Sequence, residues 1–78
     1  MSWRRKPSTY RVCMDRVISG RQLSLIANEY GYSVRLSDPF DNWPWPRLWF
    51  TDLKPAQSCY DKNLRRLRAD PFIKELEP

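Results

Sequence analysis

The sequence contains no histidine and only two glycines among its 78 residues. Histidine is the most frequent general base and metal ligand, so its absence excludes Ser–His and Cys–His nucleophilic pairs. Gly20 and Gly31 are too few to build a Gly-rich phosphate loop, and no two carboxylates stand at a helical spacing that would direct both into one site. We therefore expect a protein that is not an enzyme, with no metal, no cofactor and no small-molecule substrate.

Cysteine and long apolar runs are also scarce. Cys13 and Cys59 are too few for a disulfide framework or a four-ligand zinc site, and each lies on the apolar side of a predicted helix, which indicates small core residues. The N-terminus has no apolar signal segment, and no run approaches the roughly 20 apolar residues that cross a bilayer. These features predict a cytoplasmic protein with reduced thiols and no membrane partner.

Aromatic residues and basic charge are what the chain has in quantity. Four tryptophans, four tyrosines and three phenylalanines make 14% of the sequence, so large rings can supply the buried area that a short chain otherwise lacks. The net charge of +5 is concentrated in residues 1–16 and 54–70, which flank a near-neutral aromatic middle. We expect a flexible basic N-terminus over residues 1–8 and a single compact domain over 9–78.

The hydrophobic periods predict a small α+β domain in the order α-α-β-β-α-α. A first helix is expected in residues 8–19, because five apolar residues recur there at helical spacing: Tyr10, Cys13, Met14, Val17 and Ile18. A strand that alternates Tyr10, Val12 and Met14 is the rival interpretation. A second helix is expected over 20–30, with Gly31 as its C-terminal cap.

The second half of the chain reads as a hairpin followed by helices. Residues 32–37 alternate apolar and polar side chains, and residues 47–53 are again β-prone. These segments predict a two-stranded hairpin with a long Trp/Pro loop. Pro55 suits the start of a helix whose apolar face includes Cys59, Tyr60 and Leu67. A short terminal helix is expected from Pro71.

One stretch resembles part of a helix-turn-helix. Five residues stand at the offsets expected for the first helix and the tight turn of helix-turn-helix regulators: Ile26, Ala27, Tyr30, Gly31 and Tyr32. The resemblance implies a DNA-reading unit, with the 32–53 hairpin as a wing. The segment that should be the recognition helix, 33–41, departs from the pattern because it alternates and contains Pro39. An ordinary helical hairpin is the alternative.

Two basic groups are candidates for contacts with phosphates, since binding a polyanion needs several cations on one surface. The predicted nucleic-acid-binding residues are Arg4, Arg5, Lys6, Arg11, Lys62, Arg65, Arg66 and Arg68. The alternative for the second group is an ordinary solvated helix flank, supported by an Asp61–Arg65 pair one helical turn apart.

The segment 41–50, DNWPWPRLWF, is the candidate partner-binding surface. The prolines force an extended chain whose rings point to different sides, so not every indole can be buried. Trp49 and Phe50 are expected on opposite faces of a strand, with at least one in the core. The predicted partner-binding residues are Trp43, Trp45, Arg47 and Trp49. A Trp-Pro lid that closes the core is the alternative.

These observations favour a small non-enzymatic binding or regulatory protein that acts on nucleic acid or on a nucleoprotein complex through basic flanks and an aromatic loop. The alternative is a protein–protein inhibitor or adaptor, of the type that mobile elements encode, which blocks a host macromolecular complex. A subunit of a larger permanent assembly would also expose aromatic residues.

Overall fold

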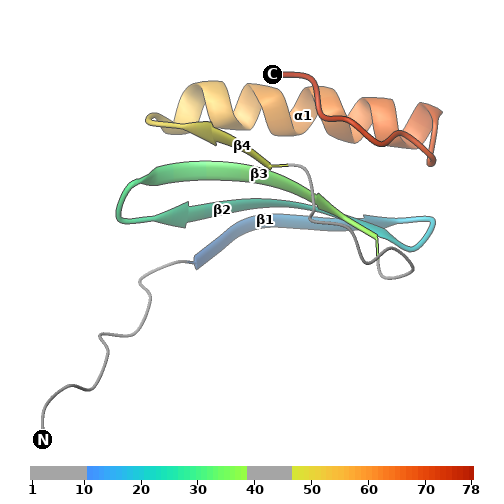
Figure 1. Cartoon of the computed structure of the whole chain (residues 1–78), viewed down its shortest axis with the longest axis horizontal. Helices are drawn as coiled ribbons and strands as arrows, with labels where there is room; N and C mark the ends of the chain where they lie inside the picture. The colour runs from blue at the N-terminus through green and yellow to red at the C-terminus, as the bar shows by residue number, and fades with distance from the viewer. Residues whose placement is uncertain (1–10, 39–46) are drawn as a thin grey trace, which may run out of the picture.

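The computed structural model describes residues 11–38 and 47–78, which form one four-stranded antiparallel sheet covered on one face by a single helix (Figure 1). The strands lie in the sheet in chain order: β1 (Arg11–Ile18), β2 (Arg21–Asn28), β3 (Gly31–Ser37) and β4 (Arg47–Phe50). The helix α1 (Leu53–Ala69) follows β4 directly.

The two expected N-terminal helices are therefore wrong, because residues 11–28 form the hairpin β1–β2 instead. Ser19 and Gly20, which read as a helix interruption, are the two residues of its turn, between the paired Ile18 and Arg21. Their φ angles of 51° and 81° are both positive, as the mirror-image turns of tight hairpins require. The helix-turn-helix is excluded with them, since Ile26 and Ala27 lie on a strand and the proposed recognition segment begins in β3.

A helical spacing arose in these strands because both faces of the hairpin carry apolar residues. Met14 and Leu25 face the helix, whereas Val12 and Ile26 pair on the opposite face. Between the two pairs, the register shifts by one residue at Cys13, which is a β-bulge. The bulge breaks the strict alternation by which a strand is recognised.

In the second half of the chain, the observed strands agree more closely with those predicted from the sequence. The expected strands at 32–37 and 47–53 correspond to β3 and β4, but they are the inner and outer strands of one meander and not an isolated hairpin. In β4, Leu48 and Phe50 pack against the core and Trp49 faces outward, 54% exposed, so Trp49 and Phe50 lie on opposite faces as expected.

The core lies between α1 and the sheet. It is built from β2, β3, α1 and the C-terminal tail, and its buried apolar members are Leu23, Leu25, Val34, Leu36, Ala56, Cys59, Tyr60, Leu67 and Leu76. Tyr60 is fully buried, and its hydroxyl donates a hydrogen bond of 3.3 Å to the carbonyl oxygen of Leu23. Cys59 is in the core as expected, but Cys13 is exposed, so that half of the cysteine prediction is wrong.

The residues after α1 form an irregular tail and not the expected terminal helix. The tail turns back along α1 (Figure 1), and Leu76 enters the core. Arg21 ties the tail to the β1–β2 hairpin, since its guanidinium donates to the carbonyl oxygens of Pro71 and Ile73. The described residues thus form two layers, a sheet and a helix with its tail.

Candidate functional site: the open face of the sheet

Alternate residues of the four strands point away from α1 and form what we call the open face. No helix or strand among residues 11–38 and 47–78 packs on this face. Strand pairing arranges it in rows that run across the sheet. One row is Asp15, Ser24, Arg35 and Arg47, and the next is Val12, Ile26, Ser33 and Trp49.

A hollow of about 290 Å³ lies on the open face, close to the lower end of the range for small-ligand sites. Its floor is low because the middle strands contribute Ser33 and Ile26, which are 2% and 7% exposed. Its walls stand higher because the outer strands contribute Trp49 and Val12, each about half exposed. The lining residues are Val12, Ile26, Asn28, Ser33, Arg35, Arg47 and Trp49.

Two arginines give one side of the hollow a positive charge. Arg35 and Arg47 are direct partners across β3 and β4, so their side chains lie on the same face of neighbouring strands. Like charges placed in this way destabilise a sheet. The guanidinium of Arg47 also lies over the indole of Trp49, 5.5 Å from the ring centre, as a cation–π pair. The two guanidinium groups beside the indole give this side of the hollow a lining that suits an anion.

The acidic residue of this face is held by its neighbours. Both carboxylate oxygens of Asp15 accept hydrogen bonds of 2.8 Å from the Gln22 side chain, and one accepts a bond of 3.0 Å from the Ser24 hydroxyl. Asp15 is on the outer strand β1, whereas Arg47 is on the opposite edge, β4. The open face therefore has Asp15 on its β1 edge and Arg47 on its β4 edge, and the hollow extends across the sheet from Val12 to Trp49.

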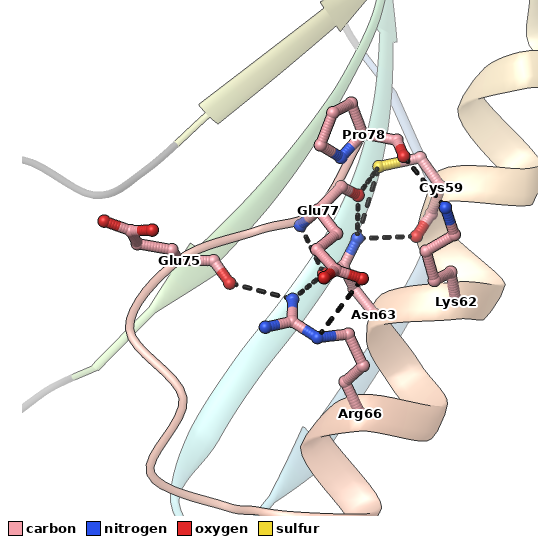
Figure 2. A network of polar contacts seen from close by, with 7 residues as sticks. All are labelled: Cys59, Lys62, Asn63, Arg66, Glu75, Glu77 and Pro78. Carbon is pink, nitrogen blue, oxygen red and sulfur yellow. Dashed lines mark hydrogen bonds and ion pairs between the residues drawn. The ribbon is translucent and has the colours of Figure 1, made fainter.

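The cations of α1 lie in the other layer, and the tail holds two of them (Figure 2). Lys62 donates a hydrogen bond of 3.0 Å to the carbonyl oxygen of Pro78. Arg66 donates to the Asn63 side chain at 2.8 Å and to the carbonyl oxygen of Glu75 at 2.9 Å, and it lies 3.6 Å from the Glu77 carboxylate. Part of the basic flank therefore fastens the tail.

Asn63 is the centre of this network (Figure 2). Its amide nitrogen donates to the carbonyl oxygens of Cys59 and Glu77, at 2.8 and 2.7 Å, and its oxygen accepts from the Glu77 backbone N–H at 2.9 Å. The Cys59 thiol donates to the same Glu77 carbonyl at 3.2 Å. Burial raises the pKa of Cys59, although Asn63 and Lys62 act in the opposite direction. The thiol is a protonated hydrogen-bond donor here, and the network holds the tail in place.

A second hollow, of about 480 Å³, lies along this flank of α1. Its lining mixes charges of both signs: Ser58, Asp61, Lys62, Arg65 and Arg66. Arg65 and Arg68 are exposed on the helix. The mixed lining and the involvement of Lys62 and Arg66 with the tail make this hollow a weaker anion site than the open face.

The structure places the two predicted sets of site residues in different layers. Arg47 and Trp49 come together on the open face, while Lys62, Arg65, Arg66 and Arg68 lie on α1 in the other layer. Arg11 is exposed at the start of β1, opposite Ala27. Five predicted site residues lie outside the described ranges: Arg4, Arg5, Lys6, Trp43 and Trp45.

Sequence reasoning missed the remaining residues of the hollow. Arg35 could have been found, because it alternates with Val34 and Leu36 and must face away from the core in any strand that buries them. Asn28 and Ile26 could not, because the hairpin β1–β2 was read as helix. The sequence analysis therefore predicted only the two strands that correspond to β3 and β4, and it did not predict a four-stranded face.

Comparison of the chain with protein-family models, with curated proteins and with solved structures yields no match. Within residues 11–38 and 47–78, no helix is long and apolar enough to cross a membrane. The functional argument therefore depends on the geometry of the open face.

Proposed function

We propose that the protein is a non-enzymatic binding module that holds single-stranded nucleic acid on the open face of its sheet. The observation that carries this proposal is the exposed indole of Trp49 with Arg47 over it and Arg35 directly across the strand pair. Aromatic rings and cations on one surface are the two parts that single-strand binding needs: a platform for bases and a charge for phosphates.

The shape of the site favours a single strand over a duplex. The hollow is lined from four neighbouring strands, and it offers no protruding helix that could enter a major groove. A base can reach Trp49 once it is unstacked from its neighbours, which is the ordinary state of a single strand. Stacking on an aromatic side chain contributes about 1–3 kcal/mol per base and tolerates any sequence.

The hollow contains binding groups and no catalytic set. Its lining has guanidinium, amide, hydroxyl and apolar side chains, and no carboxylate or thiol among the described lining residues. This composition supports a binding role over a chemical one. The cytoplasmic location expected from the sequence belongs to the same proposal, and cell fractionation tests it.

The test is titration of a fluorescein-labelled oligothymidylate at low salt, followed by anisotropy. Trp49→Ala should weaken binding by about 1–3 kcal/mol, while Trp49→Phe should retain most of the affinity because a ring remains. Phe72→Ala is the matched control, since Phe72 is an exposed ring in the tail, 79% accessible and far from the hollow in sequence. The proposal fails if no oligonucleotide binds, or if Trp49→Ala binds as tightly as the unchanged protein.

A protein partner is the second candidate, and one observation favours it. Val12 and Val17 are 52% and 65% exposed on the same face as Trp49 and Arg47. Tryptophan and arginine are frequent anchors of protein interfaces, and exposed valines add apolar contact. An inhibitor or adaptor that blocks a host complex would bind its target through this same face. This function would be favoured if no nucleic acid bound and if Trp49→Ala abolished the binding of a purified protein partner.

A further inference from the structure

We infer that Arg35 and Arg47 bind the terminal phosphate of a single strand, so that the open face prefers a phosphorylated end to the interior of the strand. This inference rests on the proposed function and names the part of the strand that occupies the hollow. It follows from the pairing of two guanidinium groups at one point of the lining.

The two arginines are close enough to act on one phosphate group. Directly opposed residues of an antiparallel pair have Cβ atoms about 4.5–5.5 Å apart, and Arg35 and Arg47 are opposed in this way. The guanidinium of arginine matches the oxygens of a phosphate with two parallel N–H donors. The contact of Arg47 with the ring of Trp49 also limits the positions of its guanidinium, so less freedom is lost on binding.

A terminal phosphate matches this pair better than a phosphate within the strand does. Each phosphate within a strand carries one negative charge. A terminal phosphate monoester carries about −1.5 to −2 at pH 7 and has three strong acceptor oxygens. The pair carries two positive charges, whose repulsion across the strands a second negative charge offsets more fully. The match in charge and in acceptors therefore favours the end of the strand.

The negative charge of the same row lies nearer the opposite edge of the sheet. Asp15 is on β1, which β2 separates from β3, so its backbone is roughly 10 Å from that of Arg35 at the usual strand spacing. Gln22 and Ser24 donate hydrogen bonds to its carboxylate. The positive charge of the row is therefore concentrated at β3 and β4, beside the hollow.

The base that reaches Trp49 is then the terminal one. The guanidinium carbon of Arg47 lies 5.5 Å from the centre of the indole ring, so a phosphate bound by Arg47 is beside that ring. The nucleotide that carries this phosphate has its own base within reach of Trp49, which is about half exposed. The arginine pair and the ring thus act on one nucleotide at the end of the strand.

The experiment is a competition in which unlabelled oligothymidylates displace a fluorescein-labelled oligothymidylate, so that no label blocks the end under study. One competitor has a 5′-phosphate, a second has a 3′-phosphate, and a third has hydroxyl ends and is one residue longer. The third strand has the same number of phosphate groups, none of them terminal. We expect a phosphorylated strand to compete about three- to tenfold better, as charge-assisted hydrogen bonds at a partly exposed site contribute.

The preference should depend on pH in a way that belongs to the ligand. A phosphate monoester loses its second charge below a pKa of about 6. The chain has no histidine, so its side chains keep nearly the same charge between about pH 7.5 and pH 5. The ratio between the phosphorylated and the hydroxyl strand should therefore shrink toward one at about pH 5, while the hydroxyl strand competes almost as before.

Substitutions assign the preference to the pair. Arg35→Gln and Arg47→Gln should each bring the ratio close to one, because a single guanidinium no longer matches the second charge. Arg65→Gln is the matched control, since Arg65 is exposed on α1 in the other layer and should leave the ratio unchanged. Inorganic phosphate should compete at least about tenfold more weakly than the phosphorylated strand, because it offers no base to Trp49.

The outcomes separate this inference from the proposed function. A gain with either phosphorylated strand that disappears in the arginine variants supports the inference and identifies the end. Equal competition by all strands, a gain that persists in both arginine variants, or inorganic phosphate as effective as the strand overturns it while the proposed function stands. If the labelled oligothymidylate does not bind at all, both are overturned.

Discussion

Tyr60 and Cys59 are neighbouring residues of α1 whose ionisable groups are enclosed by the core. Burial is the main cause that raises the pKa of each side chain above its ordinary value, 10.0 for tyrosine and 9.0 for cysteine. The negative charges of Asp15 and Asp61 raise the pKa of Tyr60 further, and Arg16 and Arg68 partly oppose them. In the folded chain both side chains therefore keep their protons to a higher pH than they do when exposed to water.

The free energy of unfolding should consequently fall in alkaline solution. The unfolded chain loses these protons near pH 9 and 10, before the folded chain does, so stability is complete below pH 9 and declines as the pH rises toward the folded-state pKa values. Each group can contribute a slope of at most about 1.4 kcal/mol per pH unit. Tyr60→Phe should flatten the decline above pH 10, while costing about 0.5–1.5 kcal/mol at neutral pH for the lost bond to Leu23.

Urea unfolding followed by circular dichroism at several pH values between neutrality and pH 11 measures this slope. Tyr30→Phe is the control, since Tyr30 is 79% exposed and should not alter the alkaline decline. An identical slope in the Tyr60→Phe protein would contradict the assignment.

At the scale of elements, Gly31 is the first residue of the inner strand β3 and lies against the edge strand β4. Its φ of +139° is a conformation that side-chain-bearing residues rarely adopt, and a Cβ at this position would collide with the carbonyl oxygen of Phe50. Gly31→Ala should therefore destabilise the fold by about 3 kcal/mol or more, since strain and overlap add. Gly20 also has a positive φ, but it lies in an exposed turn. Gly20→Ala should therefore cost only about 1–2 kcal/mol. Thermal unfolding of the two variants compares them, and equal losses would show that the contact with Phe50 is unimportant.

The tail offers a second test at this scale. Leu76 is 9% exposed and belongs to the core, whereas Phe72 in the same tail is 79% exposed. Leu76→Ala should cost about 2–5 kcal/mol, and Phe72→Ala should stay within about 0.5 kcal/mol. Chemical denaturation measures both. A loss below 1 kcal/mol for Leu76→Ala would show that the tail does not complete the core.

The elements differ in how far the sequence predicts them. For β3 and for the buried face of α1, one face is apolar and the other polar, so the period identified them. For β1 and β2, Val12, Val17 and Ile26 place apolar side chains on the open face, and the bulge at Cys13 interrupts the alternation. Apolar residues that belong to the candidate site were therefore counted as one side of a helix. The apolar side chains on the open face help to form the hollow, and they are also the reason why β1 and β2 were predicted as helices.

At the scale of the whole molecule, the two layers separate stability from binding. The core lies between α1 and one face of the sheet, and the hollow lies on the other face. The sequence placed Trp49 and Phe50 on opposite faces of one strand, but the grouping of Trp49 with Arg35 requires the register of β3 and β4. The sequence assigned Arg47 to the partner-binding set and the helix cations to the nucleic-acid-binding set, and the salt dependence of binding can decide which of the two sets meets phosphates.

If Arg35 and Arg47 are the residues that meet phosphates, the logarithm of the association constant should fall with the logarithm of salt concentration with a slope of about −1.4. Arg65→Ala and Arg68→Ala should leave this slope unchanged, since both residues lie on α1. Arg47→Ala should reduce its magnitude by about 0.7. A slope several times steeper, flattened by the α1 substitutions, would instead show that the strand runs over the helix layer. Anisotropy titrations at graded salt concentrations distinguish the two.

The bulge at Cys13 has a consequence for protein engineering. Because side chains of a strand alternate strictly between faces, one additional residue inverts the orientation of everything that precedes it. Deletion of Cys13 would remove the extra residue and join Val12 directly to Met14, so that regular alternation would keep Met14 on the core face and Val12 opposite Ile26 at the wall of the hollow. The outer strand would become regular, and the apolar wall would be retained in a chain one residue shorter.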